Sequence, residues 1–322
     1  MKLLFCLLSP VSCLLALAAV QGVVTNTTTG QPQSSVMVVL MQPGAQGMQT
    51  LGTARTAEDG GFRIDKDIPP GPGLVQASYK GATYTLMIVP GSPTTGLRVS
   101  VFDTTTDLKV ARVKQHIYLV EPTPQKLDIT ETFLVQNDSK TTFADPAKGS
   151  IQVFVPANAF EKDLQATVNF TGSMPIRRPL EKTAQDGVYK IAYPVKPGET
   201  RFDISYSLPA SDKWASKDMR PEAPARVVSA AAVRLSGTGI EDLGQEPTTQ
   251  AHLYEVKSPS FDIAIEGTGS LRTADASAKE DNGQPPILEQ PARLYSQMGW
   301  VLGLTFGILL VGGTILFRRG QV

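Results

Sequence analysis

The chain has 322 residues, and its 30 lysines and arginines balance its 30 aspartates and glutamates, so the formal net charge is zero. Because the charges are balanced, the sequence shows no basic patch for nucleic acid or an anionic surface, and we expect neither as a partner. Both cysteines, Cys6 and Cys13, lie in an N-terminal apolar segment, so the rest of the chain offers no disulfide, thiolate metal site or thiol nucleophile.

The first predicted element is a secretory signal peptide over residues 1–18. Lys2 precedes an apolar run that ends in small residues near Ala18, the pattern of a cleaved leader. Pro10 interrupts the run and no charged flank follows it, which argues against a first membrane anchor. We therefore expect the mature chain to begin outside the cytoplasm.

A β-rich domain is predicted next, over residues 19–104. Apolar and polar side chains alternate at residues 36–40 and 61–65, and turn residues separate these runs, as in an antiparallel β-sandwich. Gly30 and Gly60 lie where the chain reverses between strands, so both are expected to have positive φ. Phe62 and its neighbour two positions on, Ile64, are expected to point together into the core.

The residues of this segment also carry a family resemblance. The chain reads VQGVVTN from residue 20, then TGQP, VMVVL and TARTAEDGGFRI, the last ending at residue 64. This pattern resembles the carboxypeptidase regulatory-like domain over residues 20–102, which implies a transthyretin-like seven-stranded sandwich common in exported bacterial proteins. An expanded loop at residues 69–74 replaces the usual Pro-x-Gly-x-Tyr turn of that family. The resemblance implies a fold and brings no catalytic residue.

A second β region is predicted over residues 109–267. A polar stretch at residues 210–224 divides it, so residues 225–267 either complete the second sandwich or form a third module. The fold class is therefore all-β, with tandem antiparallel β-sandwiches followed by a C-terminal transmembrane helix. The expected strands are residues 112–119, 127–136, 151–155, 167–170, 188–193, 200–208, 231–235, 251–256 and 261–265.

The C-terminal part is predicted to be a stalk and a membrane span. Residues 268–297 are rich in Gly, Ser, Ala, Asp, Glu, Gln and Pro, so burial of apolar groups cannot offset chain entropy and a disordered stalk results. Residues 299–317 form an uncharged apolar run of about 19 residues, which nearly spans a bilayer core. Arg318 and Arg319 close this run and place the tail, residues 318–322, in the cytoplasm.

One stripe of this predicted helix consists of Gly299, Gly303 and Gly307. Glycines spaced four residues apart let two helix backbones approach closely in lipid, so these three are the candidate packing residues of a weak homodimer. The alternative is that they are merely tolerated, because glycine is common in transmembrane helices and Gly312 and Gly313 break the register.

Neither histidine predicts a metal site. His116 lies in an apolar predicted strand, and His252 begins the sequence His-x-x-Glu that is similar to part of the zinc carboxypeptidase motif. No further histidine follows to complete such a site, and positions i and i+3 of a strand point to opposite faces. His252 and Glu255 are therefore not expected to bind one metal.

The carboxylates likewise show no pairing signal. Glu121, Asp128 and Glu131 are predicted to lie solvated at strand edges. The acidic group around Asp59 is predicted to form a hairpin turn rather than a calcium site, since its spacing matches no known loop. That group comprises Glu58, Asp59, Asp65 and Asp67.

These observations favour a non-enzymatic, membrane-tethered extracytoplasmic module that presents its sandwiches to a protein partner or an envelope polymer. No catalytic, cofactor-binding or metal-binding residue is assigned. A carbohydrate-binding module is one alternative, although aromatic residues make up only 7% of the chain and show no clustered pair. A hydrolase with a Ser, Asp, Glu or Lys site that the sequence does not reveal is the other.

Overall fold

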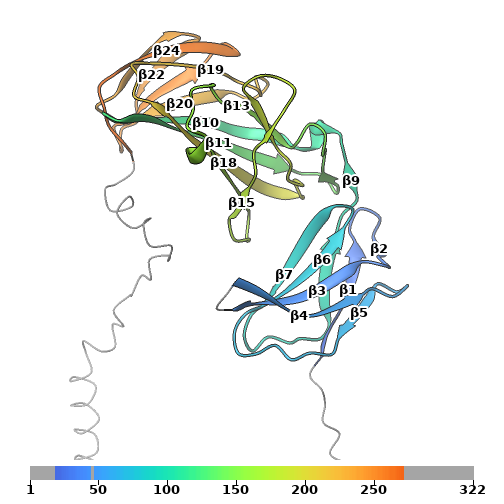
Figure 1. The fold of residues 1–322 in the computed structure, drawn as a ribbon. Coiled ribbons are helices and arrows are strands. Elements are labelled where there is room, and N and C mark those ends of the chain that lie inside the picture. The colour runs from blue at the N-terminus through green and yellow to red at the C-terminus, as the bar shows by residue number, and fades with distance from the viewer. Residues whose placement is uncertain (1–18, 45–46, 272–322) are drawn as a thin grey trace, which may run out of the picture. The chain divides into compact units, whose positions relative to one another are not determined.

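The computed structural model describes residues 19–44 and 47–271 (Figure 1). This part of the chain is nearly all β and contains several antiparallel sheets, with no α-helix. Its only helical turns are two short 3₁₀ segments, η1 (Leu108–Val110) and η2 (Glu161–Asp163). The all-β class predicted from the period-two patterns is thus confirmed for the described residues.

Two facing sheets with a shared core make up what we call the N-terminal module. Strand β1 pairs antiparallel with β2 and β5 and parallel with β8, while β4, β3, β6 and β7 follow one another in the other sheet. Apolar side chains from both sheets, including Phe62 and Leu40, form one buried cluster. The strands are β1 (Val20–Asn26), β2 (Gln31–Pro32), β3 (Met37–Gly44), β4 (Gly47–Arg55), β5 (Gly61–Ile64), β6 (Gly73–Tyr79), β7 (Ala82–Ile88) and β8 (Leu97–Val101).

The glycine turns of this module have the predicted conformation. Gly30 and Gly60 adopt φ of +75° and +74°. A Cβ at Gly60 would also lie 2.6 Å from the carbonyl oxygen of Val24, so both conformation and space favour glycine there. Phe62 and Ile64 are both buried in the shared core, as predicted.

An eight-stranded sheet dominates what we call the C-terminal module, which has a second buried cluster of its own. The strand order is β15-β14-β18-β11-β10-β20-β23-β22, and β10 and β20 pair in parallel. The strands are β10 (Arg112–Pro122), β11 (Lys126–Asn137), β14 (Gln165–Phe170), β15 (Ile176–Arg178), β18 (Gly198–Pro209), β20 (Ala225–Ser229), β22 (Ile240–Gln245) and β23 (His252–Val256).

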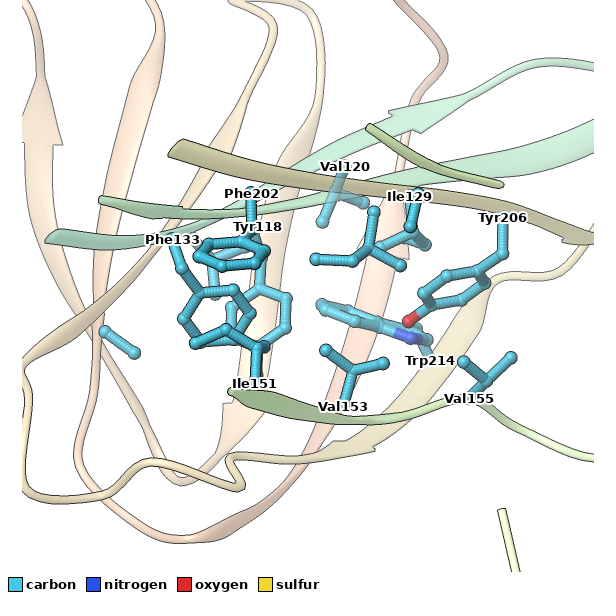
Figure 2. Packing of buried hydrophobic residues seen from close by; sticks show 14 of the residues in the cluster. Tyr118, Val120, Ile129, Phe133, Ile151, Val153, Val155, Phe202, Tyr206 and Trp214 are labelled. Atoms are coloured by element: carbon cyan, nitrogen blue, oxygen red, sulfur yellow. The ribbon is translucent and has the colours of Figure 1, made fainter. Parts of the chain in front are cut away.

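Smaller sheets cover the core face of this large sheet. Figure 2 shows Phe133, Ile129 and Tyr206 pointing from it toward Ile151 and Val153 on β13. The remaining strands are β9 (Thr104–Thr105), β12 (Thr142–Phe143), β13 (Ile151–Phe154), β16 (Glu181–Lys182), β17 (Val188–Ile191), β19 (Lys213–Lys217), β21 (Arg234–Thr238) and β24 (Ser260–Glu266).

The polar stretch at residues 210–224, where a division of the second β region was one of two alternatives, contains β19, which pairs with β24. Trp214 and Ser216 are buried while Lys213, Ala215 and Lys217 are exposed, so this short strand alternates correctly despite its polar composition. Residues 225–267 supply three strands to the eight-stranded sheet and two to the sheet of β19. Together with β10–β18 they enclose one core.

Candidate functional site

The outward side of the sheet formed by β4, β3, β6 and β7 is the first candidate site. Alternate residues of these strands, such as Val38 and Val75, are buried in the core, so the residues between them point away from it. Cross-strand pairing places the outward residues of all four strands on one surface. We call this surface the outer face: Met37, Val39, Met41, Met48, Thr50, Thr53, Arg55, Leu74, Gln76, Ser78, Thr83, Thr85 and Met87.

The outer face is almost free of charge. Its only charged residue, Arg55, lies at the end of β4, and its Nη1 donates a hydrogen bond to the carbonyl oxygen of Ser35 at 3.0 Å. Residues 20–54 contain no Asp, Glu, Lys or Arg at all. Solvated sheet surfaces normally carry interspersed charges that keep them soluble and unpaired, so this face departs from an ordinary solvent surface.

An apolar row crosses the outer face. Met41 pairs with Leu74, and Leu74 pairs with Met87, so the three side chains are neighbours across three strands. Met87 is 54% exposed and Met48 is 42% exposed. Methionine is flexible and polarisable, and exposed methionine-rich surfaces adapt to varied protein partners. The signal was present in the sequence, since the strand segments carry apolar residues on both registers and lack charge.

The second candidate is an ionic cluster inside the C-terminal module, which we call the His116 cluster: His116 on β10, Glu131 on β11 and Asp218 after β19. His116 Nε2 lies 2.7 Å from Glu131 Oε1, and Nδ1 lies 3.4 Å from Asp218 Oδ1. The three side chains are only 0%, 1% and 5% exposed. Phe133 stacks on the imidazole with ring centroids 4.1 Å apart.

The surroundings of the cluster favour a charged imidazole. Burial alone would lower the pKa of His116, but the interactions with Asp218 and Glu131 outweigh it and raise that pKa to about 9. Burial also raises the pKa of the Glu131 carboxyl, and the hydrogen bond with His116 opposes that rise. The cluster is enclosed, and it brings together β10, β11 and the residue that follows β19.

The sequence-based placement of the carboxylates at solvated edges is wrong for two of the three. Glu131 is buried on a central strand, because it occupies the core-facing register of β11. Glu121 is also buried, and it accepts a hydrogen bond from the backbone nitrogen of Leu271 at 2.9 Å. Asp128 is partly exposed, with its Oδ1 2.9 Å from Lys126 Nζ and 2.6 Å from Ser207 Oγ.

The other sequence candidates do not form a metal centre. His252 is buried with its Nε2 3.1 Å from Gln245 Nε2, and Glu255 pairs instead with Lys257 at 2.6 Å. Asp59 Oδ1 accepts a hydrogen bond from Gly61 N at 2.8 Å, as a turn residue does. Within residues 19–44 and 47–271, no group of three or more metal-ligating side chains could hold an ion.

The predicted membrane elements lie outside the described residues. These are the signal peptide at residues 1–18, the span at residues 299–317 and its candidate packing residues Gly299, Gly303 and Gly307. Across the described ranges, no helix reaches the length and hydropathy that a membrane crossing requires.

Comparisons with known proteins assign no family. No family model matches the chain, and no curated protein matches it. Among solved structures, a mutant M1 zinc metallopeptidase from Deinococcus radiodurans bound to a Tyr-Ser-Ala substrate is 12% identical, with a TM-score of 0.27. That match covers 48% of this chain and 43% of the metallopeptidase. The enzyme without the mutation is 12% identical over 48% of this chain and 42% of its own, with a TM-score of 0.26. This chain thus spans less than half of the metallopeptidases it matches.

Proposed function

We propose that this chain is a non-enzymatic, membrane-tethered extracytoplasmic module that binds a protein partner through the outer face of its N-terminal module. The observation that carries the proposal is a four-stranded sheet surface with exposed methionines and one peripheral charge. The pattern of residues 1–18 and 299–317 supports the tether and its orientation. The resemblance to the carboxypeptidase regulatory-like domain supports a sandwich that displays surfaces without catalysis.

The composition of the outer face favours protein over carbohydrate. Sugar-binding surfaces stack rings of Trp, Tyr or Phe against the sugar, and the outer face contains none of these residues. It offers Met, Leu and Val for apolar contact and Thr, Gln and Ser for hydrogen bonds. That combination suits the weakly polar core of a protein interface, where charged residues are depleted.

Site-specific photocrosslinking in native membranes tests the proposal. A photoreactive amino acid at Met87 should give a discrete crosslinked product, whereas the same group at Asp65 should not. Asp65 is the matched control because it is exposed just after β5, outside the sheet of the outer face. Adding Met41→Asp should abolish the Met87 product while leaving the melting temperature nearly unchanged, because Met41 points away from the core. Equal crosslinking at both positions, or a product insensitive to Met41→Asp, would contradict the proposal.

A further inference from the structure

The His116 cluster lies where the two layers of the C-terminal module are joined. Asp218 follows β19, and the turn of residues 218–223 carries the chain from the β19 sheet into β20 of the eight-stranded sheet. There β20 pairs in parallel with β10, and Ala225 is the direct partner of His116. The cluster therefore links β10 and β11 to the turn that precedes β20.

Hydrogen bonds and buried side chains also hold this turn. Asp218 N donates to the carbonyl oxygen of Pro259 at 2.8 Å, and Arg220 N donates to Asp218 Oδ1 at 2.8 Å. The Arg220 side chain is buried and pairs with Glu222 inside the same turn. The contact between Asp218 and His116 is thus the charged connection between this turn and the eight-stranded sheet.

The two carboxylates beside the imidazole favour its protonated form. Both ring nitrogens face carboxylate oxygens, Nε2 toward Glu131 and Nδ1 toward Asp218. Nε2 lies within hydrogen-bond distance of Glu131, whereas Nδ1 makes no hydrogen bond among the described residues and faces the Asp218 carboxylate as an ion pair, which only the imidazolium can form. Tyr118 on β10 contacts the ring, and Tyr206 on β18 interacts with Glu131; neither phenol supplies a positive charge. The nearest other charged groups on the turn are Arg220 and Glu222, which pair with each other.

We infer that His116 is a proton-dependent lock that, as the imidazolium, fastens the 218–223 turn and the start of β20 to β10 and β11. When the imidazole loses its proton, the buried ion pair between His116 and Asp218 is lost and the turn is released. This inference concerns the C-terminal module and does not rest on the proposed function of the outer face.

The direction of the pH dependence follows from linkage. The pKa of His116 rises from an ordinary value of 6.5 to about 9 in the fold, so the closed turn holds a proton that the open turn gives up. The full stabilisation is present below pH 6.5 and is lost as the pH rises toward 9. The open fraction should therefore grow across this window, by at most about 300-fold because the contact with Glu131 persists in the open turn, and then level off.

Hydrogen–deuterium exchange of the full-length protein between pH 6 and 10 tests the lock. After division by the intrinsic exchange rate, the protection of a peptide covering residues 218–224 should fall by up to this factor. A peptide from β5 in the N-terminal module serves as the reference and should keep constant protection. A titration of the His116 ring by NMR should show a midpoint near 9, well above that of an exposed imidazole.

Two variants separate the lock from a general effect of alkali. His116→Gln should remove the pH dependence of the 218–224 peptide, and Asp218→Asn should weaken it. His252→Gln is the matched control, since it removes the other buried imidazole, which contacts Gln245 and no carboxylate. Should the variants fail to fold, the wild-type titration still decides. Constant protection of residues 218–224 between pH 6.5 and 9 would overturn the inference, as would an unchanged pH dependence in His116→Gln.

Discussion

Glu131 places a carboxylate in the middle of an apolar sheet face, between Ile129 and Phe133 on the core side of β11. A buried carboxylate is tolerated only when charge and hydrogen bonds compensate it, and His116 at 2.7 Å provides both. The core therefore tolerates the Glu131 carboxylate only together with His116.

We predict that Glu131→Ala lowers the free energy of unfolding by about 3–5 kcal/mol, because it removes the hydrogen-bonded carboxylate of a buried ion pair and leaves His116 with Asp218 alone. Urea denaturation followed by Trp214 fluorescence measures the loss. Lys126→Ala on the same strand is the control and should cost about 1 kcal/mol or less, since its contact with Asp128 is partly exposed. Similar losses in the two variants would contradict a buried ionic role for Glu131.

Single residues also show what the sequence could and could not predict. The φ angles of Gly30 and Gly60 follow from a local chain reversal, so the motif alone predicts them. Burial of Glu131 was accessible as well, because its neighbours two positions away on each side are apolar. Its connection through His116 to Asp218 was not, because the three residues meet only when distant strands pack together.

At the scale of elements, β19 shows how composition can hide a strand. Lys213, Ala215 and Lys217 face solvent, so only Trp214 and Ser216 mark the buried side. Period two over five residues is a weak pattern, and the surrounding charged and proline-rich residues obscured it. Longer strands such as β11 and β18 alternate over 12 residues each, and the sequence predicted most of both.

Trp214→Ala should destabilise the C-terminal module by about 3–5 kcal/mol, because it empties a site enclosed by Tyr118 and Phe261. Thermal unfolding followed by far-ultraviolet circular dichroism measures this change. Lys213→Ala is the control on the same strand and should shift stability by about 0.5 kcal/mol at most. If Trp214→Ala were as mild as the control, β19 would not belong to the core.

The outer face shows a second limit of sequence-based prediction, which concerns the side of a strand that is buried. Period-two patterns predicted β3 correctly, yet they could not say which of its two apolar registers meets the core. That depends on the neighbouring sheet, which local sequence does not encode.

At the scale of the whole molecule, the two apolar clusters have no residue in common. We therefore predict two separate unfolding transitions in differential scanning calorimetry. Gly22→Ala should lower the transition temperature of the N-terminal module alone and reduce its free energy of unfolding by about 1–3 kcal/mol. The reason is that the new Cβ would lie 2.4 Å from the carbonyl oxygen of Leu97.

The fluorescence of Trp214 should report the other transition and remain unchanged in this variant. A single transition, or one in which Gly22→Ala also shifts the Trp214 signal, would show that the modules unfold together.

The parallel pairing of β1 with β8 has a consequence for the time course of folding. Gly22 pairs with Leu97, and Asn26 pairs with Val101. The first strand of the N-terminal module can therefore complete its pairing only after its last strand has formed. Closing a loop of roughly 75 residues costs chain entropy before any contact repays it, which places such pairings late and slows folding to milliseconds or longer. Until that closure, β1, which carries no charged residue, is left without one of its partner strands. The chain is then most exposed to aggregation, because an uncharged strand edge is left unpaired.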